Sequence, residues 1–294
     1  MQARKLFGTG ILPDCEKCLQ RLIKLTAEQA TSDEAIREKA VKSANQILEK
    51  LKSMPGINPA HIANRFHPVI KTICENPDPF RKMKEREILT AEELAAKYPP
   101  GKEWTFKDYV KYSLIGNSID FFRNPEKLEE YLNEGLTVAR DEREQLIQKL
   151  RGASKKVLVL CDNAGEVFFD LPLLRVLASQ GHEVFYGVKG APIQNDLSWD
   201  DVSRLCIEWN GIQVVSTGAA MVGLELDRCS GYFRELYGKA DIIIGKGMGH
   251  FETLGNSGDE RVFLLFQAKC RPVAETIGVP LNSGVACFVK GGGF

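Results

Sequence analysis

The feature that most constrains the fold is an uninterrupted apolar run, Val157-Leu158-Val159-Leu160-Cys161, which polar residues bound on both sides. Such a run is typical of a strand buried on both faces, as in a parallel sheet. Strands that alternate with helices indicate βαβ units, and further segments of strand character follow, most of them separated by residues with helical periodicity: 183–188, 212–215, 241–245 and 262–266. We therefore predict an α/β fold in three αβα layers around a mostly parallel sheet.

The N-terminal half of the chain has a different pattern. Apolar residues recur there at helical spacing, and Pro and Gly residues mark the turns. The helical segments are 35–51, 126–133 and 141–151. Thr90-Ala91-Glu92-Glu93 has the pattern of a capping box, which indicates the start of a helix. We expect an all-helical N-terminal region over residues 1–152 and an α/β domain over residues 153–294.

Charge and hydropathy exclude several classes of protein. The chain of 294 residues carries 39 basic and 39 acidic residues, so nothing indicates a general attraction to nucleic acid or to an acidic membrane. No apolar run reaches the roughly 20 residues of a membrane helix, and residues 1–15 lack the pattern of a secretory signal. We expect a cytoplasmic protein whose partner is a small molecule, with no nucleic-acid and no membrane partner; the sequence indicates no oligomeric state. Segment 82–87 carries both basic and acidic side chains, and we expect it to form a solvent-exposed helix face.

Among the eight cysteines, only Cys15 and Cys18 form a close pair, with CxxC spacing. A zinc site would need about two more ligands at motif spacing. The nearest candidates, Cys74, His61 and His67, do not have that spacing. Two interpretations stay open: a metal-binding or redox pair, or two thiols on one face of the first helix.

Ligands of open α/β sheets bind beyond the carboxyl ends of the strands. The first predicted strand is followed there by Asp162 and Asn163, whose side-chain oxygens suit Mg²⁺ or Mn²⁺. The second strand is followed by Lys189 and, a few residues later, by Asp196. These residues supply oxygen ligands and a positive charge, which are parts of a metal and phosphate site.

A later strand ends in Lys246, Gly247 and Gly249. Glycines let the backbone approach an anion closely, and a lysine offers a positive point charge. The segment matches neither GxGxxG nor a Walker loop, because the lysine precedes the glycines. Each feature alone also has a structural explanation: an Asp after a strand commonly caps a helix, and such glycines commonly form turns.

Taken together, these motifs resemble those of a known family. Residues 161–170 and 246–254, with the CxxC pair and the segment Gly116-Asn117-Ser118-Ile119-Asp120, are similar to the DUF89 family of damage-control phosphatases, also called ARMT1-like, in its short prokaryotic and archaeal branch. The resemblance implies a divalent metal, Mn²⁺, Co²⁺, Ni²⁺ or Mg²⁺. It also implies hydrolysis of phosphate monoesters of small or damaged metabolites, such as sugar phosphates or phosphopantetheine-like compounds.

The resemblance also assigns roles to residues of this chain. It implies that Asp162, Asn163 and Asp196 bind the metal, that Lys246 faces the substrate phosphate, and that Glu166 lines the site. Asp162, Glu166 and Lys246 are therefore the expected catalytic residues. Either Asp162 or a metal-activated water is the nucleophile, and the sequence does not distinguish these two.

The expected substrate-binding residues come from several segments: Asn117, Asp120, Lys189, Gly247 and Glu252. Asn117 and Asp120 are expected to bring the helical region over the pocket. His250 departs from the family pattern, which has Asn at this position.

Two alternative functions stay open. The first is an S-adenosylmethionine-dependent methyltransferase, although the run of glycines usual after the first strand is missing. The second is a non-catalytic metabolite-binding module whose strand-end residues only cap helices.

Overall fold

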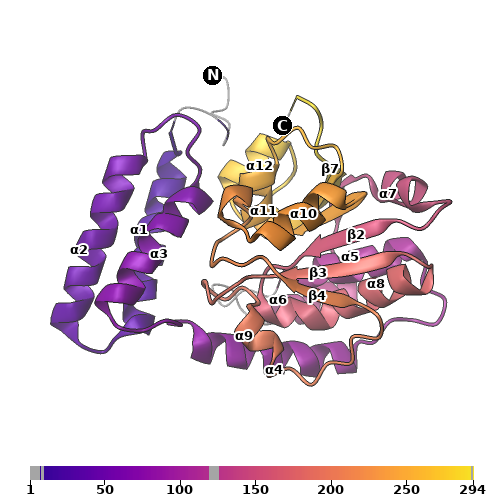
Figure 1. Ribbon diagram of the computed structural model, residues 1–294, viewed down its shortest axis with the longest axis horizontal. Helices are drawn as coiled ribbons and strands as arrows, with labels where there is room; N and C mark the ends of the chain where they lie inside the picture. The colour runs from indigo at the N-terminus through magenta and orange to yellow at the C-terminus, as the bar shows by residue number, and fades with distance from the viewer. Residues whose placement is uncertain (1–6, 8–9, 119–125, 293) are drawn as a thin grey trace.

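The computed structural model describes residue 7 and residues 10–118, 126–292 and 294 (Figure 1). Its helices are α1 (Pro13–Ala30), α2 (Glu34–Leu51), α3 (Pro59–Ile73), α4 (Arg81–Lys97), α5 (Phe106–Gly116), α6 (Glu126–Glu134), α7 (Arg143–Leu150), α8 (Val167–Ser179), α9 (Trp199–Val202), α10 (Gly231–Lys239), α11 (Gly247–Leu254) and α12 (Arg271–Ile277), with 3₁₀ turns η1 (Ala164–Glu166) and η2 (Leu226–Arg228). Its strands are β1 (Val138–Asp141), β2 (Lys156–Leu160), β3 (Glu183–Val188), β4 (Gln213–Ser216), β5 (Ile242–Lys246), β6 (Val262–Gln267) and β7 (Gly284–Phe288).

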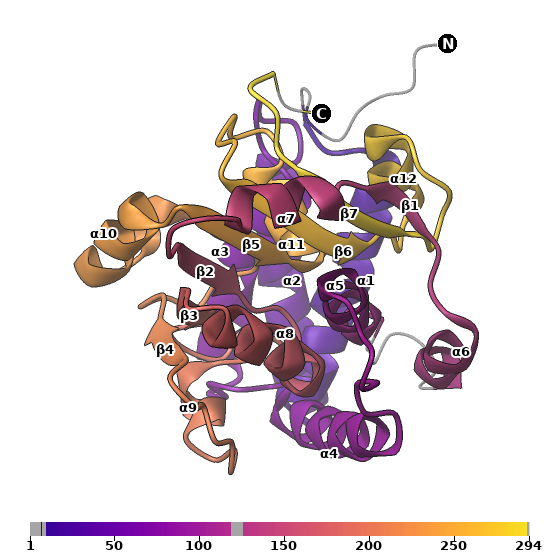
Figure 2. The same ribbon diagram turned by 90° about the vertical axis from the view of Figure 1, so that its right-hand side faces the viewer.

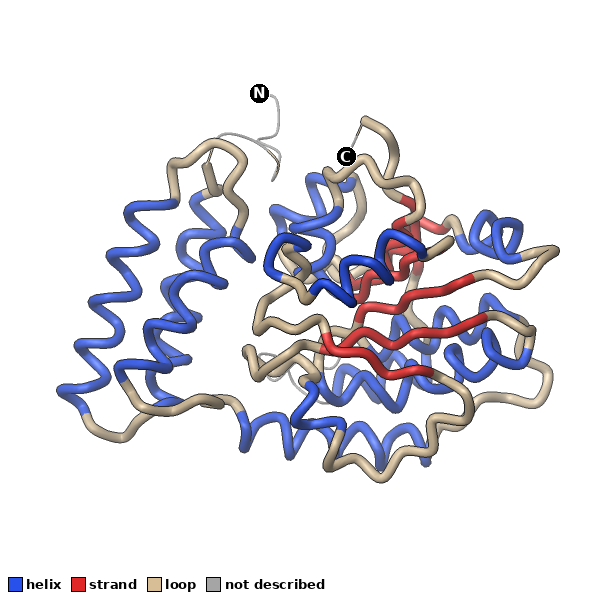
Figure 3. The backbone as a smooth tube through the Cα atoms, in the orientation of Figure 1, coloured by secondary structure: helices blue, strands red, loops and turns tan. Residues whose placement is uncertain are grey.

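The strands of the described residues form one sheet of seven, in the order β1-β7-β6-β5-β2-β3-β4. The sheet is drawn in red in Figure 3. Neighbouring strands are parallel except for β6 and β7, which are antiparallel. The expected α/β fold with a mostly parallel sheet is confirmed. The five expected strands are β2 to β6, whereas β1 and β7 were not expected.

The two faces of the sheet pack against different helices, as the alternation of side chains along a strand requires. Val157 and Val159 of β2 lie in a core with residues of α5, α7 and α8. Leu158 and Leu160 of the same strand lie in a second core, with residues of α10, α11 and α12. Figure 2 shows α5 and α8 on one side of the sheet and α10 and α12 on the other. These are the three predicted layers.

Helices α1, α2 and α3 form a separate unit with a hydrophobic core of its own, and they stand beside the sheet in Figure 1. We call these three helices the helical unit. We call the described residues from 81 onward, which contain the sheet and the helices on its two faces, the layered part. Asn58, directly before α3, joins the helical unit to it, because Asn58 Nδ2 donates to the carbonyl oxygen of Glu252 on α11. Two further bonds do the same: Asn64 Nδ2 donates to the carbonyl oxygen of Val222, and Val222 N donates to Asn64 Oδ1. The strand ends therefore face the helical unit.

Two features of the secondary structure before residue 152 differ from expectation. The predicted helix start at Thr90 is wrong, because α4 runs without a break from Arg81 to Lys97. Strand β1, which pairs with β7, comes from the expected all-helical part of the chain, and α5 and α7 pack on the sheet. The division at residue 152 stays a prediction, but the part that stands apart from the sheet is α1 to α3. Within the described ranges, no helix has the length and hydropathy needed to span a membrane.

Candidate active site

The topology brings the three expected metal ligands together. Strand β2 ends directly before Cys161, Asp162 and Asn163, while Asp196 comes from the loop between β3 and α9. A short bridge pairs Asn163 with Asp196, and the N–H of Leu197 donates to the carbonyl oxygen of Asp162 at 2.9 Å. These backbone contacts hold the loop against the end of β2.

A cavity of about 590 Å³ lies between these strand ends and the helical unit. A volume of this size is in the range of small-molecule sites. The helical unit contributes Cys18, Leu19, Arg21, Leu22, Leu25, Pro59, Ala60 and Ala63 to its lining, and the layered part contributes Asp162, Asn163, Gln194, Asn195, Asp196, Val222, Met248, Gly249, Glu252, Lys269 and Cys270. The three expected metal ligands all line this cavity.

The donor set fits a divalent cation. Oδ2 of Asp196 is buried and accepts no hydrogen bond from the described residues; its nearest cation is Lys189 Nζ at 3.5 Å. Burial, then the charges of Asp196 and Glu166, raise the pKa of Asp162 well above its usual range. Burial also raises the pKa of Asp196, to about 6, although Lys189 opposes this. No three His, Cys, Asp or Glu side chains of the described residues are placed to hold a metal. The expected set has only two such side chains, Asp162 and Asp196, because its third ligand is the amide of Asn163.

The charges around the strand ends lead to the same conclusion. Four carboxylates face three lysine ammonium groups, so the fully ionised cluster has an excess of one negative charge. The members of this cluster are Asp162, Glu166, Asp170, Asp196, Lys189, Lys246 and Lys269. Buried charges are stable only when they are paired or bound to a metal, so a divalent cation would compensate this excess.

Lys246 lies beneath the cavity. Its side chain is fully buried, and Nζ donates to Glu166 Oε2 at 2.8 Å, to Asp170 Oδ1 and to the carbonyl oxygen of Ser113. The described lining of the cavity does not include Lys246 or Glu166. The expected position of Lys246, facing a substrate phosphate, is therefore not the one that the structure shows.

Glu166 connects Lys246 to the ligands above it. Its Oε1 accepts hydrogen bonds from Asn117 Nδ2 and Asn163 Nδ2, both at 2.7 Å. Asn117 Nδ2 also lies 3.1 Å from Asp162 Oδ2. Glu166 and Asn117 thus orient Asp162 and Asn163 from behind. Asp120, expected beside Asn117, lies outside the described residues.

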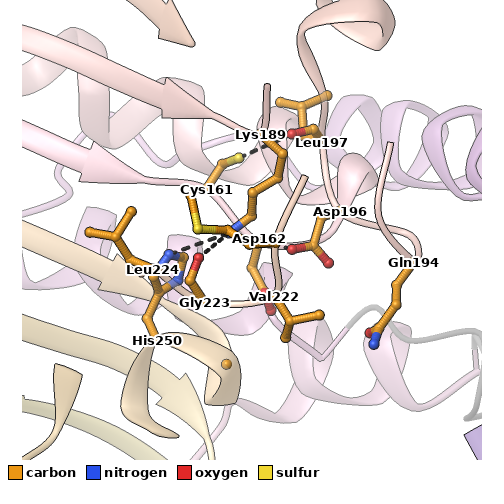
Figure 4. Close-up of polar contacts among 12 residues, drawn as sticks. Cys161, Asp162, Lys189, Gln194, Asp196, Leu197, Val222, Gly223, Leu224 and His250 are labelled. Carbon is orange, nitrogen blue, oxygen red and sulfur yellow. Dashed lines mark hydrogen bonds and ion pairs between the residues drawn. The ribbon is translucent and has the colours of Figure 1, made fainter. Parts of the chain in front are cut away.

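Figure 4 shows the end of the Lys189 side chain between His250 on one side and Asp196 on the other. Lys189 Nζ donates to the carbonyl oxygen of Gly223 at 2.9 Å and lies 3.5 Å from His250 Nε2. His250 Nδ1 donates to the carbonyl oxygen of Lys246, which leaves Nε2 to accept from Lys189. Burial, then the charge of Lys189, hold the pKa of His250 well below its usual range. His250 is therefore neutral, and it supports Lys189 without facing the cavity.

Gly247 and Glu252 complete the expected set. Gly247 has a φ of +76°, and a Cβ there would overlap the carboxylate of Asp162, so only glycine fits. Glu252 lines the cavity and accepts a hydrogen bond from the N–H of Ala60 at 2.9 Å. Burial raises the pKa of Glu252 to about 7.

With this geometry established, comparison with known proteins identifies the family. The sequence model of the family described as the damage-control phosphatase ARMT1-like domain matches residues 11–285 of this chain. The chain belongs to this family. A damage-control phosphatase of Pyrococcus horikoshii is 34% identical over 91% of this chain and 94% of its own length. One of Archaeoglobus fulgidus is 31% identical over 95% of this chain and 99% of its own length.

A solved structure of the DUF89 family agrees with the fold. The crystal structure of a DUF89 protein from Pyrococcus horikoshii superposes with a TM-score of 0.86 at 32% identity, and it covers 96% of this chain and 99% of that one. Membership of the DUF89 family, expected from the motifs, is confirmed.

Among the described residues, two cations that were not expected site residues line the cavity: Arg21 on α1 and Lys269 after β6. The charge of Lys269 favours the ionised form of Asp162. The strand-end argument, applied to the segment after 262–266, would have found Lys269.

The prediction that segment 82–87 faces solvent is wrong for two of its residues. Lys84 is buried in an ion pair with Asp201 at 2.8 Å, and buried Glu87 accepts from Asn195 Nδ2 at 3.1 Å.

The two cysteines of the CxxC pair lie in different surroundings. Cys15 is buried in the core that includes α11 and α12, and burial raises the pKa of its thiol to about 12. Cys18 is exposed and lines the cavity. All eight cysteines lie in described parts of the chain, and none is in a disulfide.

Proposed function

We propose that this protein is a metal-dependent phosphatase that hydrolyses phosphate monoesters of small metabolites. The observation that carries the proposal is the buried Oδ2 of Asp196, which accepts no hydrogen bond from the described residues, beside Asp162 in a cavity. A buried carboxylate oxygen that accepts no hydrogen bond, in a cluster with excess negative charge, fits a bound divalent cation. Membership of a family whose relatives are named damage-control phosphatases supports the same reaction.

The chain's own residues divide the work as follows. Asp162, Asn163 and Asp196 would hold Mn²⁺, Co²⁺, Ni²⁺ or Mg²⁺, which supplies charge neutralisation for the phosphoryl group. Lys269, which lines the cavity, binds a phosphate oxygen as a positive point charge. In one route Asp162 attacks phosphorus and displaces the alcohol of the ester, and water then hydrolyses the aspartyl phosphate; in the other, Asp162 orients a water that attacks phosphorus and displaces the alcohol. Asn117 fixes the Asp162 carboxylate for both routes.

Lys246 and Glu166 act through other residues. Because Lys246 contacts Glu166 and Asp170 beneath the cavity, it stabilises the carboxylate that holds Asn117 and Asn163. Lys189 does the same for Asp196. We therefore assign Lys246, Glu166 and Lys189 as positioning residues.

The eight thiols, none of them in a disulfide, support the cytoplasm as the compartment.

The decisive experiment measures phosphate release from p-nitrophenyl phosphate by metal-stripped protein. Mn²⁺, Co²⁺, Ni²⁺ and Mg²⁺ are added back singly, with Asp162→Ala and the exposed Asp227→Ala as a matched pair. We expect activity only with metal, its loss in Asp162→Ala and its retention in Asp227→Ala. Inactivity with every metal, together with no rise in melting temperature, would favour the metabolite-binding module. Binding of S-adenosylmethionine by calorimetry would favour the methyltransferase.

A further inference from the structure

The cavity has two walls of different chemistry. The wall from the layered part carries the expected metal ligands and Lys269. The opposite wall comes from α1 and α3 of the helical unit (Figure 1). Since a phosphate must lie at the first wall, the second wall contacts the rest of the substrate.

The wall from the helical unit is mainly apolar. On α1, Cys18, Leu22 and Leu25 follow one another at helical spacing, so they share one face. Leu25 is half-exposed and lies outside the three hydrophobic cores formed by the described residues, so its side chain is left to the cavity. On α3, Ala60 and Ala63 add small apolar surface.

Val222 and Met248 continue the apolar surface from the layered part. The N–H of Ala60, at the start of α3, is already bound to the carboxylate of Glu252. The polar side chains that the helical unit adds to the lining are Cys18 and Arg21, and both are exposed. Apart from the Arg21 guanidinium, this wall therefore offers few partners for hydroxyl groups.

A sugar phosphate would fit such a wall poorly, because each hydroxyl group that leaves water needs a hydrogen-bond partner. An apolar group gains instead, by about fourfold in affinity for each buried methylene. We propose that the preferred substrates are phosphate monoesters whose alcohol carries an apolar body, which packs against Leu22, Leu25 and Val222. This inference rests on the proposed phosphatase function and narrows its substrate class, against sugar phosphates.

The test compares two esters with the same six-carbon chain, n-hexyl phosphate and glucitol 6-phosphate, with Mn²⁺ and p-nitrophenyl phosphate as reference. We expect kcat/KM for hexyl phosphate to exceed that for glucitol 6-phosphate by at least about tenfold. Equal values, or a preference for glucitol 6-phosphate, would overturn the inference. So would hydrolysis of p-nitrophenyl phosphate alone, whereas failure with all three esters would overturn the proposed function instead.

Variants locate the preference on the helical unit. Leu25→Asn should lower the ratio of the two kcat/KM values by about fivefold or more, because it replaces part of the apolar wall by an amide. Leu89→Asn is the matched control, since Leu89 is 59% exposed on α4 and lies away from the cavity. Val222→Thr, which keeps the shape of the side chain, should lower the ratio in the same direction. An unchanged ratio in both Leu25→Asn and Val222→Thr would contradict the proposed wall.

Discussion

Asn117 and Glu166 are 49 residues apart in the sequence, yet Asn117 Nδ2 lies 2.7 Å from Glu166 Oε1. The same amide group lies 3.1 Å from Asp162 Oδ2, and Asn117 Oδ1 accepts a hydrogen bond from the N–H of Gln267. One side chain at the end of α5 therefore connects the ends of β2 and β6. It sets the orientation of Asp162, on which both proposed routes of hydrolysis depend.

Replacing this amide by a carboxylate tests its importance. Asn117→Asp removes the donor and puts a negative charge beside Asp162 and Glu166, so we expect kcat to fall by roughly 10- to 100-fold, the equivalent of about 1.5–3 kcal/mol for a hydrogen bond to a charged group. Steady-state kinetics with Mn²⁺ measures this. Asn256→Asp, at an exposed position after α11, is the control and should keep wild-type kcat. Equal rates in both variants would exclude a role for Asn117.

Asp196→Asn tests the metal site through binding. In the wild type, metal at a 100-fold excess over Kd should stabilise the folded state by about 2.7 kcal/mol, seen as a higher melting temperature. We expect Asp196→Asn to lose most of this shift with Mn²⁺, because a neutral amide replaces the carboxylate whose buried Oδ2 accepts no hydrogen bond from the described residues. The exposed Asp200→Asn should keep the full shift. A full shift in Asp196→Asn would remove this residue from the metal site.

Lys246→Met tests the ion pairs beneath the cavity. The variant leaves Glu166 and Asp170 buried without their cation, and breaking a buried pair in this way typically costs about 3–5 kcal/mol. Urea denaturation measures the loss in the free energy of unfolding. Lys239→Met removes a lysine from an exposed pair with Glu235, where a change of no more than about 1 kcal/mol is expected. Similar stability of the two variants would show that the buried pairs are not needed for the fold.

Glu252 should make stability depend on pH in a defined direction. Burial raises its pKa from an ordinary 4.5 to about 7. Between these values the folded protein keeps a proton that the unfolded chain releases, so this group lowers the free energy of unfolding as pH rises to about 7, and no further above it. Glu252→Gln should therefore be more stable than the wild type at pH 8, and the difference should shrink towards pH 5. The exposed Glu260→Gln should follow the wild type at every pH; parallel profiles for all three proteins would contradict the prediction.

The sequence predicts the central strands because their apolar runs are long and buried on both faces. Strand β1 was missed because it has only four residues, Val138–Asp141, and alternates between half-buried and exposed positions at the edge of the sheet. Strand β7, Gly284–Phe288, contains Gly and Ala, which have little strand propensity. Its burial comes from its neighbours β6 and β1.

The convergence of Asp162, Asn163 and Asp196 follows from parallel topology, because parallel strands end at the same edge of the sheet. The face of the sheet to which the Lys246 side chain belongs does not follow from a motif. Alternation along β5 puts Lys246 on the same face as Ile242 and Ile244, whose core includes α5 and α8. Counting residues within the strand could have shown this, whereas the burial of Lys84 and Glu87 depends on contacts with segments more than 100 residues away.

The two walls of the cavity come from parts of the chain that are far apart: α1 and α3 end at Ile73, whereas the metal-ligand wall begins at Asp162. Mutations can therefore accumulate on the surface of α1 and α3 that faces the cavity without disturbing the residues that cleave the phosphate ester. Members of one lineage could in this way acquire different substrates while inheriting the same reaction. For protein engineering, the practical result is that exchanging a few side chains of α1 is the direct way to redirect specificity.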